Sequence, residues 1–391
     1  MKQKSEYLRI KSKSKYFVFM ALYFVLYPIC KILYGRKRNW LVCERSDEAQ
    51  DNGFIFFKYL IENHPEIKPV YLIDKKSKEY EKVSKIGKTV QFGSFKHLLI
   101  VIGYPVKIST QLFGYAHWVQ LKTYYRRNKT RGVHVFLQHG ITKNDHEGLY
   151  SYTCKSLGLF VCGSKPEYES IYKDFHYLNN VPQYTGFARY DLLFDYKVKN
   201  QLLFMPTWRQ DLSDCSDEEF LNTDFYLSWS KLINANELIE HCKKSNTTVK
   251  FYLHHSFKKF SHLFKGNEVV KIVGFSEESV QNLLKESKLL ITDFSSVFFD
   301  FAYMNKPMIF YQFDEESFNS RHYQKGYFDY RRDGFGDVCL SLDEVLKSLS
   351  KIIDNSYEVE QKYVSRTNNT FVYHDQNNCN RIYEAITRAK K

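Results

Sequence analysis

The chain contains the run Leu289-Leu290-Ile291-Thr292-Asp293-Phe294-Ser295-Ser296-Val297-Phe298-Phe299-Asp300-Phe301-Ala302, and the run Lys306-Pro307-Met308-Ile309-Phe310-Tyr311 follows closely. An apolar run, a polar turn, an amphipathic helical pattern and a second apolar run predict a β-turn-α-β unit. Such a unit is half of a doubly wound sheet. In that fold the turn lies at the carboxyl end of the first strand, where open α/β sheets bind ligands.

The polar turn is the first candidate site. The helix after it points free N–H groups and its positive dipole end into the turn, so Ser295 and Ser296 lie where a phosphate binds. An alternative is that Asp293 or Ser295 only caps the helix, which such residues do routinely. From the residues alone, both interpretations stay open.

The rest of the chain alternates strand-like and helix-like segments. Strand candidates before Leu193 are Trp40–Cys43, Val70–Ile73, Val106–Ser109, Val133–Leu137 and Leu159–Cys162, and those after it are Leu202–Met205, Val249–Leu253, Val269–Val273, Leu289–Thr292 and Met308–Tyr311. A helical pattern covers Phe54 to Asn63. This order predicts two parallel, doubly wound α/β domains, 39–195 and 196–391, joined by the polar segment Phe194 to Asn200.

Composition narrows the class of protein. A chain of 391 residues with 43% hydrophobic and 26% charged residues is typical of a folded protein with two domains. A net charge of +13 favours an anionic partner: nucleic acid, anionic lipid or a nucleotide diphosphate. The eight cysteines form no CxxC pair, which is typical of reduced thiols in a cytosolic protein.

Residues 1–38 combine basic and apolar segments. Six basic residues precede the apolar run Tyr16–Cys30, which contains Pro28 and several tyrosines, and Lys31, Arg36, Lys37 and Arg38 follow it. The run is shorter than the ~20 residues of a spanning helix. We therefore predict a helix that lies on the cytoplasmic face of the cell membrane and contacts anionic lipid, with a single spanning helix as the alternative.

Six motifs, in order along the chain, resemble those of the CDP-glycerol glycerophosphotransferase family of teichoic acid primases and polymerases. The first run above is similar to the family's I-[ST]-D-[YF]-S-S-V-x-F-D-[FY]-A signature. The others are Asp51-Asn52-Gly53, Gln138-His139-Gly140, Thr185-Gly186-Phe187-Ala188-Arg189-Tyr190-Asp191, Met205-Pro206-Thr207-Trp208-Arg209 and Lys325-Gly326-Tyr327-Phe328-Asp329-Tyr330. Together they extend from about Arg36 to the C-terminus.

The resemblance implies a fold and an activity. The fold is the GT-B type, in which two Rossmann-like domains face each other across a cleft, with the donor bound by the second domain. The activity is transfer of glycerol phosphate from CDP-glycerol to a hydroxyl of a lipid-linked or growing cell-wall or capsular glycan, with release of CMP. Alternatives within the enzyme class are ribitol phosphate transfer from CDP-ribitol and a nucleotide-sugar glycosyltransferase on the same fold.

His139 is the predicted catalytic base. It follows a strand, and a histidine there has a pKa near working pH and can accept a proton from a hydroxyl. A structural histidine is the alternative from the residues alone, whereas the resemblance implies catalysis. Gly140 lets another group approach the backbone. Gln138 and Ile141-Thr142 depart from the family's W-H-G-T-P, which leaves the acceptor open.

The donor site is predicted from several strand ends. The resemblance implies a functional histidine at His254, with His255 beside it, to neutralise the leaving phosphate. Thr207 and Arg209 are candidates to bind the diphosphate through a hydroxyl and a guanidinium. Packing at the domain link by Trp208, with a surface ion pair at Arg209, is the alternative.

Weaker candidates complete the site. Asp293 and Asp300 are assigned to the donor, because Asp300 lies about two helical turns after Asp293 and can reach a ribose or glycerol hydroxyl or brace the loop. Arg189 and Asp191 lie in the motif before the domain link, and Asp191 has a structural role as its alternative. The segment 325–330 either shapes the nucleotide pocket or has only a packing role.

We predict no cofactor, no protein-bound metal and no nucleic acid. The tandem His254 and His255 lack a nearby cysteine or carboxylate to complete a metal site. The rival from another class is a non-catalytic basic protein that binds nucleic acid or anionic membrane. The sequence shows no nucleic-acid motif and no basic stripe interleaved with stacking aromatics.

Overall fold

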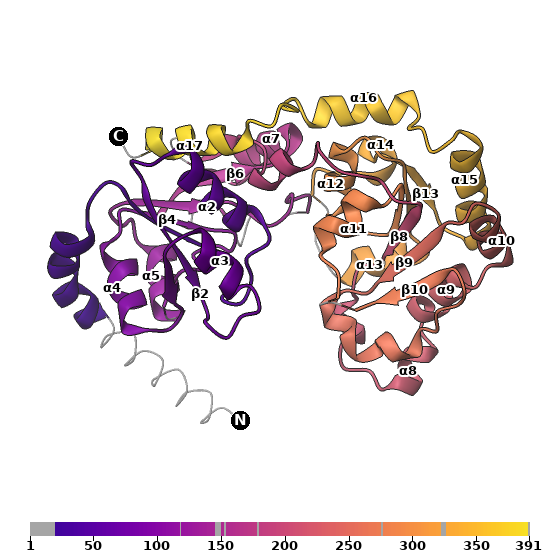
Figure 1. The fold of residues 1–391 in the computed structure, drawn as a ribbon, viewed down its shortest axis with the longest axis horizontal. Coiled ribbons are helices and arrows are strands. Elements are labelled where there is room, and N and C mark those ends of the chain that lie inside the picture. Colours follow the sequence, from indigo (N-terminus) through magenta and orange to yellow (C-terminus); the bar gives the residue numbers. More distant parts are fainter. Residues whose placement is uncertain are drawn as a thin grey trace. The chain divides into compact units, whose positions relative to one another are not determined.

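The computed structural model describes residues 20–117, 119–144, 150–151, 154–177, 180–274, 277–321 and 326–389. The chain forms two compact units, coloured along the sequence in Figure 1. Unit 1 comprises residues 1–141, 147–191 and 375–391, and unit 2 comprises residues 142–146 and 192–374. Both are parallel α/β units, as the sequence predicts, and the GT-B arrangement of the two stays a prediction.

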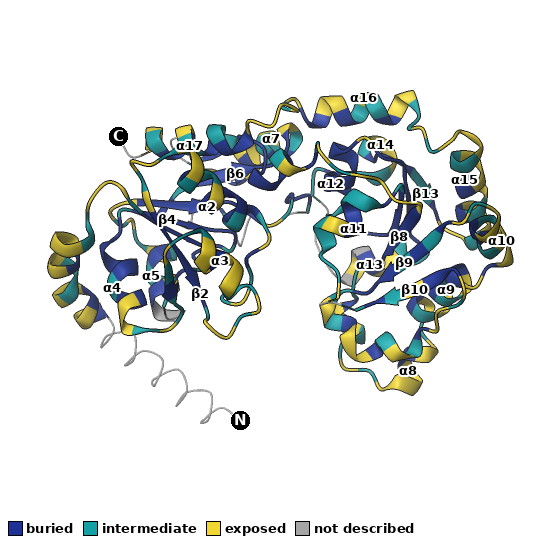
Figure 2. Ribbon diagram, in the orientation of Figure 1, coloured by how far each residue is buried: buried dark blue, intermediate teal, exposed yellow. Residues whose placement is uncertain are grey.

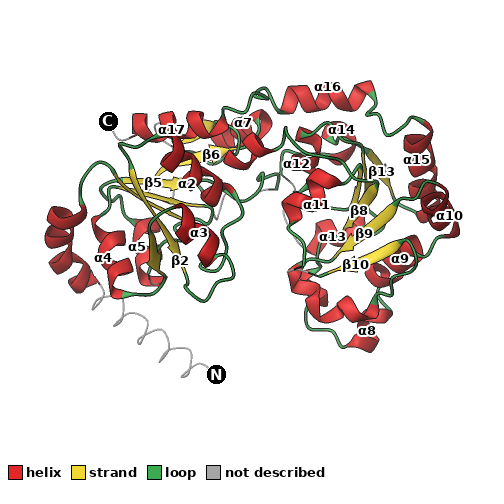
Figure 3. Ribbon diagram, viewed as in Figure 1, coloured by secondary structure: helices red, strands yellow, loops and turns green. Residues whose placement is uncertain are grey.

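Unit 1 is a seven-stranded parallel sheet with helices between its strands (Figure 3). Its elements are β1 (Asn39–Cys43), α2 (Asn52–Asn63), β2 (Lys68–Ile73), α3 (Tyr80–Ile86), β3 (Thr89–Gln91), α4 (Phe95–Gly103), β4 (Val106–Ser109), α5 (Val119–Arg127), β5 (Val133–Phe136), β6 (Leu157–Cys162), α7 (Lys165–Asp174), β7 (Pro182–Tyr184), η1 (Ala188–Leu192) and α17 (Asn378–Ala389). The strand order is β3-β2-β1-β4-β5-β6-β7. From β1 the chain adds β2 and β3 on one side of the sheet, and then adds β4 to β7 on the other side of β1. The boundary between β1 and β4 is therefore the topological switch point, where open sheets bind ligands.

Unit 2 is a six-stranded parallel sheet in the order β10-β9-β8-β11-β12-β13. Its elements are β8 (Gln201–Met205), η2 (Gln210–Leu212), α8 (Asp217–Leu221), α9 (Asp224–Ile233), α10 (Asn236–Lys244), β9 (Thr248–Tyr252), η3 (His255–Leu263), β10 (Val270–Val273), α11 (Val280–Glu286), β11 (Leu289–Thr292), α12 (Phe298–Tyr303), β12 (Met308–Tyr311), α13 (Glu315–Arg321), α14 (Tyr330–Asp333), β13 (Asp337–Cys339), α15 (Leu342–Asp354) and α16 (Gln361–Thr370). Its switch point lies between β8 and β11. The predicted β-turn-α-β unit is therefore β11, α12 and β12, next to the switch point.

The interior strands are apolar on both faces because helices cover both sides of the sheet. All four residues of β11 and of β12 are buried. The strands β4 and β8 are also buried throughout and are dark blue in Figure 2. Continuous apolar runs are typical of such strands, and every strand candidate in the sequence corresponds to a strand of the structure. The prediction missed β3, β7 and β13, which are three residues long and carry polar residues at the sheet edges.

The domain boundary is corrected at the C-terminus. Residues 375–391 belong to unit 1, because α17 packs against β5 and β6. Asp191 caps this helix: its carboxylate accepts hydrogen bonds from the backbone of Asn378 (2.9 Å) and Cys379 (2.8 Å). Gly186 has φ +74°, and a Cβ there would lie 1.9 Å from Oδ1 of Asn378, so glycine is required where the helix docks.

The N-terminal anchor is partly within the described residues. Residues 20–34 are helical, and this helix, indigo in Figure 1, packs against unit 1. The ring of Tyr23 lies 5.3 Å from that of Tyr124 on α5, and Cys30 approaches Gly103 on α4. Across the described parts of the chain, the helices lack the combined length and apolar character needed to cross a membrane. Residues 1–19 of the predicted anchor lie outside the described residues.

Buried His97 makes the stability of unit 1 depend on pH. Its Nδ1 accepts from Gly93 N (3.1 Å) and its Nε2 lies 2.8 Å from Tyr115 O, and burial lowers the pKa of His97 from 6.5 to about 4. The unfolded chain therefore takes up this proton first as pH falls below 6.5. We expect His97 alone to reduce the free energy of unfolding by about 2 kcal/mol between pH 6.5 and 5.

Denaturant unfolding of the wild type and of His97→Gln at pH 7 and pH 5 measures this effect. Glutamine offers the same partners an oxygen and an NH₂ group but does not titrate. The variant is expected to lose less stability than the wild type between the two pH values. Equal losses in both proteins would show that His97 is not the group responsible.

Candidate active site at the carboxyl ends of both sheets

The backbone around His139 is fixed by buried polar groups of unit 1. Gln138, the residue before it, has φ +59° and a buried side chain whose Nε2 donates to Val161 O (2.6 Å) and Glu167 Oε1 (3.0 Å). Asn52 Nδ2 donates to Gln138 O at 2.9 Å. The departure at Gln138 from the family motif thus has a structural role. Its left-handed conformation turns His139 outward at the end of β5.

The ring of His139 is partly exposed beside the end of β4. Its Nδ1 lies 3.4 Å from both Thr110 O and Gln111 Nε2. Crowding by the surrounding chain reduces hydration of the ring and lowers the pKa of His139, while Asp51 acts in the opposite direction. A lowered pKa keeps the imidazole neutral at neutral pH, which is the form that accepts a proton.

Arg189 and the Asp51-Asn52-Gly53 motif lie next to His139 at the carboxyl ends of the strands. Arg189 Nη1 donates to Asp51 Oδ1 (2.9 Å) and to His139 O (3.3 Å), and Asn52 Oδ1 accepts from Arg189 N (3.1 Å). Three of the sequence motifs therefore meet through hydrogen bonds within unit 1. Arg189 is best described as a positioning residue, because its guanidinium holds the loop that carries His139.

Glu44 holds the Asp51 loop, a contact that the sequence did not indicate. Its buried carboxylate accepts from the backbone N–H groups of Gln50 (2.9 Å), Asp51 (3.0 Å) and Phe54 (2.7 Å). Burial and the nearby Asp51 raise the pKa of Glu44, and the three N–H donors oppose that rise. A Cβ on Gly53 would lie 2.8 Å from Cγ of Glu44, which explains the glycine of this motif. A single acid directly after an apolar strand is the only signal in the sequence.

In unit 2, Arg209 and Asp293 are paired with each other. Arg209 Nη2 donates to Asp293 Oδ2 (2.9 Å) and Asp314 Oδ1 (2.9 Å), and Nε donates to Asp314 Oδ2 (2.7 Å). Asp293 Oδ1 accepts from Thr207 N at 2.8 Å. Arg209 and Asp293 are 4% and 0% exposed. The predicted diphosphate contact at Arg209 stays a prediction, and these bonds favour a positioning role that fixes the ends of β8 and β11.

The turn after β11 presents hydroxyl groups. Ser295 and Ser296 are half-buried, and Ser295 Oγ is 3.5 Å from Val297 N. Neither Asp293 nor Ser295 caps α12, whose first residue is Phe298 and whose N-cap residue, Val297, makes no side-chain bond. Thr207 Oγ1 is buried and has no hydrogen-bond partner among the described residues. Polar groups of this kind, next to the switch point, are suited to a bound phosphate.

His254 lies at the end of the neighbouring strand β9. Its Nδ1 accepts from Ser256 N at 3.2 Å, which places the proton of a neutral ring on Nε2. The rings of Trp208 and His254 stack at 5.9 Å, so the Trp208 turn and the histidine support each other. His255 is exposed, with its ring 4.1 Å from that of His254.

Lys143 is a cation that the sequence did not single out. Its side chain is 7% exposed, and Nζ lies 5.6 Å from the centre of the Tyr330 ring. Burial lowers the pKa of Lys143 to about 8, while Asp293 raises it. No described carboxylate forms an ion pair with Lys143. Gly326 lies against this segment, since a Cβ there would meet Lys143 O at 2.3 Å.

The remaining candidates are placed as follows. Asp300 is buried in α12, but Asp293 precedes that helix, so the two do not lie on successive turns of one helix. Asp191 caps α17, which supports the structural alternative. Gly140 is half-buried, and Lys325 lies outside the described residues. Within the described ranges, His, Cys, Asp and Glu residues form no group of three or more that could hold a metal ion.

Two doubly wound units with polar residues at the carboxyl ends of their strands define the class of two-domain α/β proteins that bind ligands at a switch point. The sequence profile of the CDP-Glycerol:Poly(glycerophosphate) glycerophosphotransferase family matches residues 26–388. The chain therefore belongs to that family, which confirms the resemblance seen in the six motifs.

Known relatives agree with this assignment. The chain is 35% identical over 366 residues to the minor teichoic acid biosynthesis protein GgaB of Bacillus subtilis (strain 168), covering 90% of this chain and 40% of that protein. It is 28% identical over 228 residues to the teichoic acid ribitol-phosphate polymerase TarK of Staphylococcus aureus (strain NCTC 8325 / PS 47), covering 54% and 41%. The chain thus spans about 40% of the length of these curated relatives.

A solved structure shows the same fold. The wall teichoic acid polymerase TagF superposes with a TM-score of 0.69 at 14% identity, covering 97% of both chains. At this identity the likeness concerns the fold alone. It confirms two parallel-sheet α/β domains.

Proposed function

We propose that the protein transfers a polyol phosphate, with glycerol phosphate first, from its CDP-activated form to a hydroxyl of a growing teichoic acid-type glycan, and releases CMP. The observation that carries this proposal is a set of polar groups of unit 2 at the carboxyl ends of two paired strands. Thr207 follows β8, Ser295 and Ser296 follow β11, and Lys143 interacts with the charge of Asp293. These groups are donors suited to a diphosphate.

The proposed reaction is a single displacement at phosphorus. The acceptor oxygen forms a new bond to the β-phosphorus while the bond to the CMP oxygen breaks. Neutral His139 takes the proton of the acceptor hydroxyl. Lys143, the serine hydroxyls and His254 Nε2–H stabilise the charge that moves onto CMP, and one such donor is typically worth ~3 kcal/mol.

Lys143 gives the first prediction for the donor site. Because a hydrogen bond to a charged group contributes roughly 1.5–3 kcal/mol, Lys143→Met is expected to raise the KM for the CDP-polyol by about 10- to 100-fold. The pKa of about 8 means that Lys143 loses its charge as pH rises above 8. We therefore also expect the wild-type KM to increase between pH 8 and 9.5.

Steady-state kinetics of CMP release over this pH range tests both effects. The matched control is Lys265→Met, which removes an exposed lysine of the same unit. An unchanged KM in Lys143→Met, or a KM that rises with pH equally in that variant, would exclude Lys143 from the donor site.

The identity of the donor is tested by CMP release from CDP-glycerol and CDP-ribitol and by UDP release from UDP-N-acetylglucosamine, with membrane extract as the source of acceptor. Release from a CDP-polyol supports the proposal and distinguishes glycerol from ribitol. Release from the UDP-sugar alone would instead support the glycosyltransferase alternative, and binding of DNA without any turnover would support the non-catalytic one.

We also propose that unit 1 docks on an anionic membrane surface. The helix at residues 20–34 exposes a set of large apolar side chains: Leu22, Phe24, Val25, Ile29, Ile32 and Leu33. Ile32 and Val25 are 82% and 67% exposed. Exposed apolar side chains beside a basic helix such as α5 are typical of interfacial association.

Co-sedimentation with phosphatidylglycerol vesicles tests this membrane face. Burial of each side chain contributes roughly 1.5–3 kcal/mol, so Val25→Ser/Ile32→Ser is expected to weaken vesicle binding more than about tenfold. The control Val198→Ser/Val372→Ser removes two exposed valines of unit 2. Equal binding of both variants and the wild type would exclude this face.

A further inference from the structure

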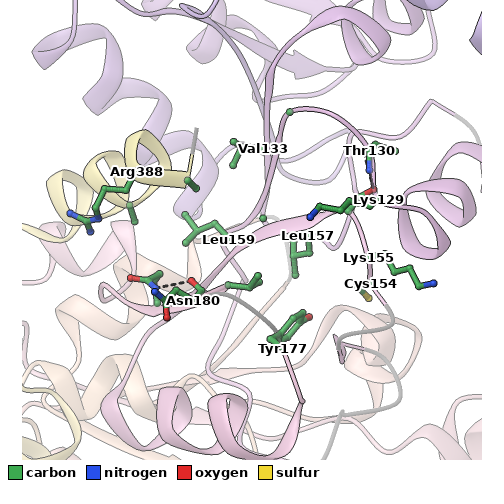
Figure 4. Close-up of a pocket in the computed structure, with 17 residues that line it drawn as sticks. Lys129, Thr130, Val133, Cys154, Lys155, Leu157, Leu159, Tyr177, Asn180 and Arg388 are labelled. Atoms are coloured by element: carbon green, nitrogen blue, oxygen red, sulfur yellow. Dashed lines mark hydrogen bonds between the residues drawn. The ribbon is translucent and has the colours of Figure 1, made fainter. Parts of the chain in front are cut away.

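A cavity of unit 1 lies away from the candidate active site. It has a volume of about 700 Å³ and is lined at the starts of β5, β6 and β7 and at the end of α17 (Figure 4). His139 follows β5, at the carboxyl ends of the strands, which is the opposite side of the sheet. The cavity is therefore distinct from the site around His139.

The lining of this cavity combines an apolar floor with cations. Val133, Leu157 and Leu159 contribute apolar side chains, while Lys129, Lys155 and Arg388 contribute positive charge, and none of the lining residues is acidic. Figure 4 shows Lys129 extending over the floor, with Lys155 and Arg388 on opposite sides. Such a combination fits a ligand that has both an anionic and an apolar part.

Lys129 and Lys155 have no acidic partner among the residues that the structure describes. Arg388 lies 3.5 Å from Glu384, whereas neither lysine forms an ion pair with any described carboxylate. Several other polar groups of the lining have partners within unit 1: Thr130 Oγ1 lies 2.8 Å from Ser156 Oγ, and Tyr177 OH donates to Tyr150 O. The sequence from Lys82 to Asn144, which contributes Lys129 and Val133 to the lining, contains no aspartate or glutamate.

The cavity lies at the amino ends of the strands, and the helix at residues 20–34 ends on the same side of the sheet. That helix leads directly into the start of β1, and all strands of the sheet are parallel. β5 is two strands from β1, a separation of about 10 Å. Tyr124, which packs against Tyr23 and Phe24 of the helix, precedes Lys129 by little more than one helical turn.

We propose that this cavity binds the phosphate group of an anionic lipid, with the apolar part of that lipid over Val133, Leu157 and Leu159. The phosphate contacts Lys129 and Lys155. A polyol-phosphate polymer has the phosphate but not the apolar part, so the apolar floor favours the lipid. The proposal relies on the membrane face only for access, and a soluble lipid tests it without a membrane.

The test measures binding of dihexanoyl phosphatidylglycerol below its micellar concentration to the full chain by calorimetry. Dihexanoyl phosphatidylcholine and poly(glycerol phosphate) serve as comparison ligands. Each basic residue near a lipid phosphate contributes about fivefold in affinity, so Lys129→Ala/Lys155→Ala is expected to bind more than about tenfold more weakly. The double variant Lys75→Ala/Lys78→Ala removes two exposed lysines from the opposite edge and is expected to bind like the wild type.

Ala389→Trp supplies a second variant, because Ala389 is an exposed lining residue and a large ring there fills the cavity without touching the core. It is also expected to abolish lipid binding. No binding of phosphatidylglycerol, equal binding by the Lys129/Lys155 variant, or tighter binding of poly(glycerol phosphate) would overturn the proposal. CMP release with saturating soluble acceptor is expected to be unchanged in all these variants, which separates failure of this site from failure of the proposed reaction.

Discussion

We expect replacement of His139 by alanine to lower kcat for CMP release by about 10²- to 10⁴-fold, the range of a positioned general base, and to leave donor binding intact. The ring lies at the end of β5, and its contacts to Thr110 O and Gln111 Nε2 are long, at 3.4 Å each, so its removal is expected to cost little stability. Its loss therefore acts on the chemical step rather than on stability.

The pH profile adds a readout specific to the base. Because crowding holds the pKa of His139 below the ordinary value of 6.5, wild-type kcat is expected to fall only below that pH. His139→Ala should lose this acidic limb, and His262→Ala, at an exposed histidine of unit 2, should keep both rate and profile. A His139→Ala enzyme that retains the limb would assign the base elsewhere.

We expect replacement of Arg209 by methionine to destabilise unit 2 by about 3–5 kcal/mol, the typical cost of breaking a buried ion pair. Asp293 and Asp314 then lose the same guanidinium at the junction of β8 and β11. Burial alone lowers the pKa of Arg209, but the two aspartates more than offset this and raise it. The cation is therefore retained at any pH at which the protein folds.

Denaturant unfolding of Arg209→Met, Arg209→Lys and Arg331→Met measures this effect. Lysine keeps the charge but lacks the planar fork, so an intermediate loss is expected. Arg331 pairs with Glu315 at the surface, and its replacement is expected to cost about 0–1 kcal/mol. If Arg209→Met kept its stability but lost affinity for the CDP-polyol, Arg209 would instead contact the diphosphate, as the sequence predicts.

Interior strands could be predicted from the sequence, whereas most strands at the edges of the sheets could not. Interior strands such as β4 and β11 are buried on both faces, so their continuous apolar runs predict them directly. The edge strands β3, β7 and β13 lack such runs, because only one of the three residues of each is buried. The return of α17 to unit 1 depends on distant contacts, among them the Asp191 cap, which leave no local pattern.

The candidate site shows the same division. The sequence singled out His139, Arg189 and the Asp51 loop as separate motifs, and the structure shows that hydrogen bonds join them. The motifs did not predict that Arg209 is engaged by two carboxylates, since Asp314 is distant in sequence and carries no motif. Lys143 and Glu44 were missed for the same reason: burial gives them their altered pKa, and burial of a single charged residue is not visible in the sequence.

The central claim is transfer of a polyol phosphate with His139 as base, and mass analysis of the acceptor tests it most directly. The wild type and His139→Ala are incubated with CDP-glycerol or CDP-ribitol and a glycan acceptor primed with one polyol phosphate. The account predicts an acceptor heavier by whole polyol phosphate units, formed with an equal amount of CMP by the wild type and not by the variant. CMP formation without any mass added to the acceptor, or equal products from both proteins, would contradict it.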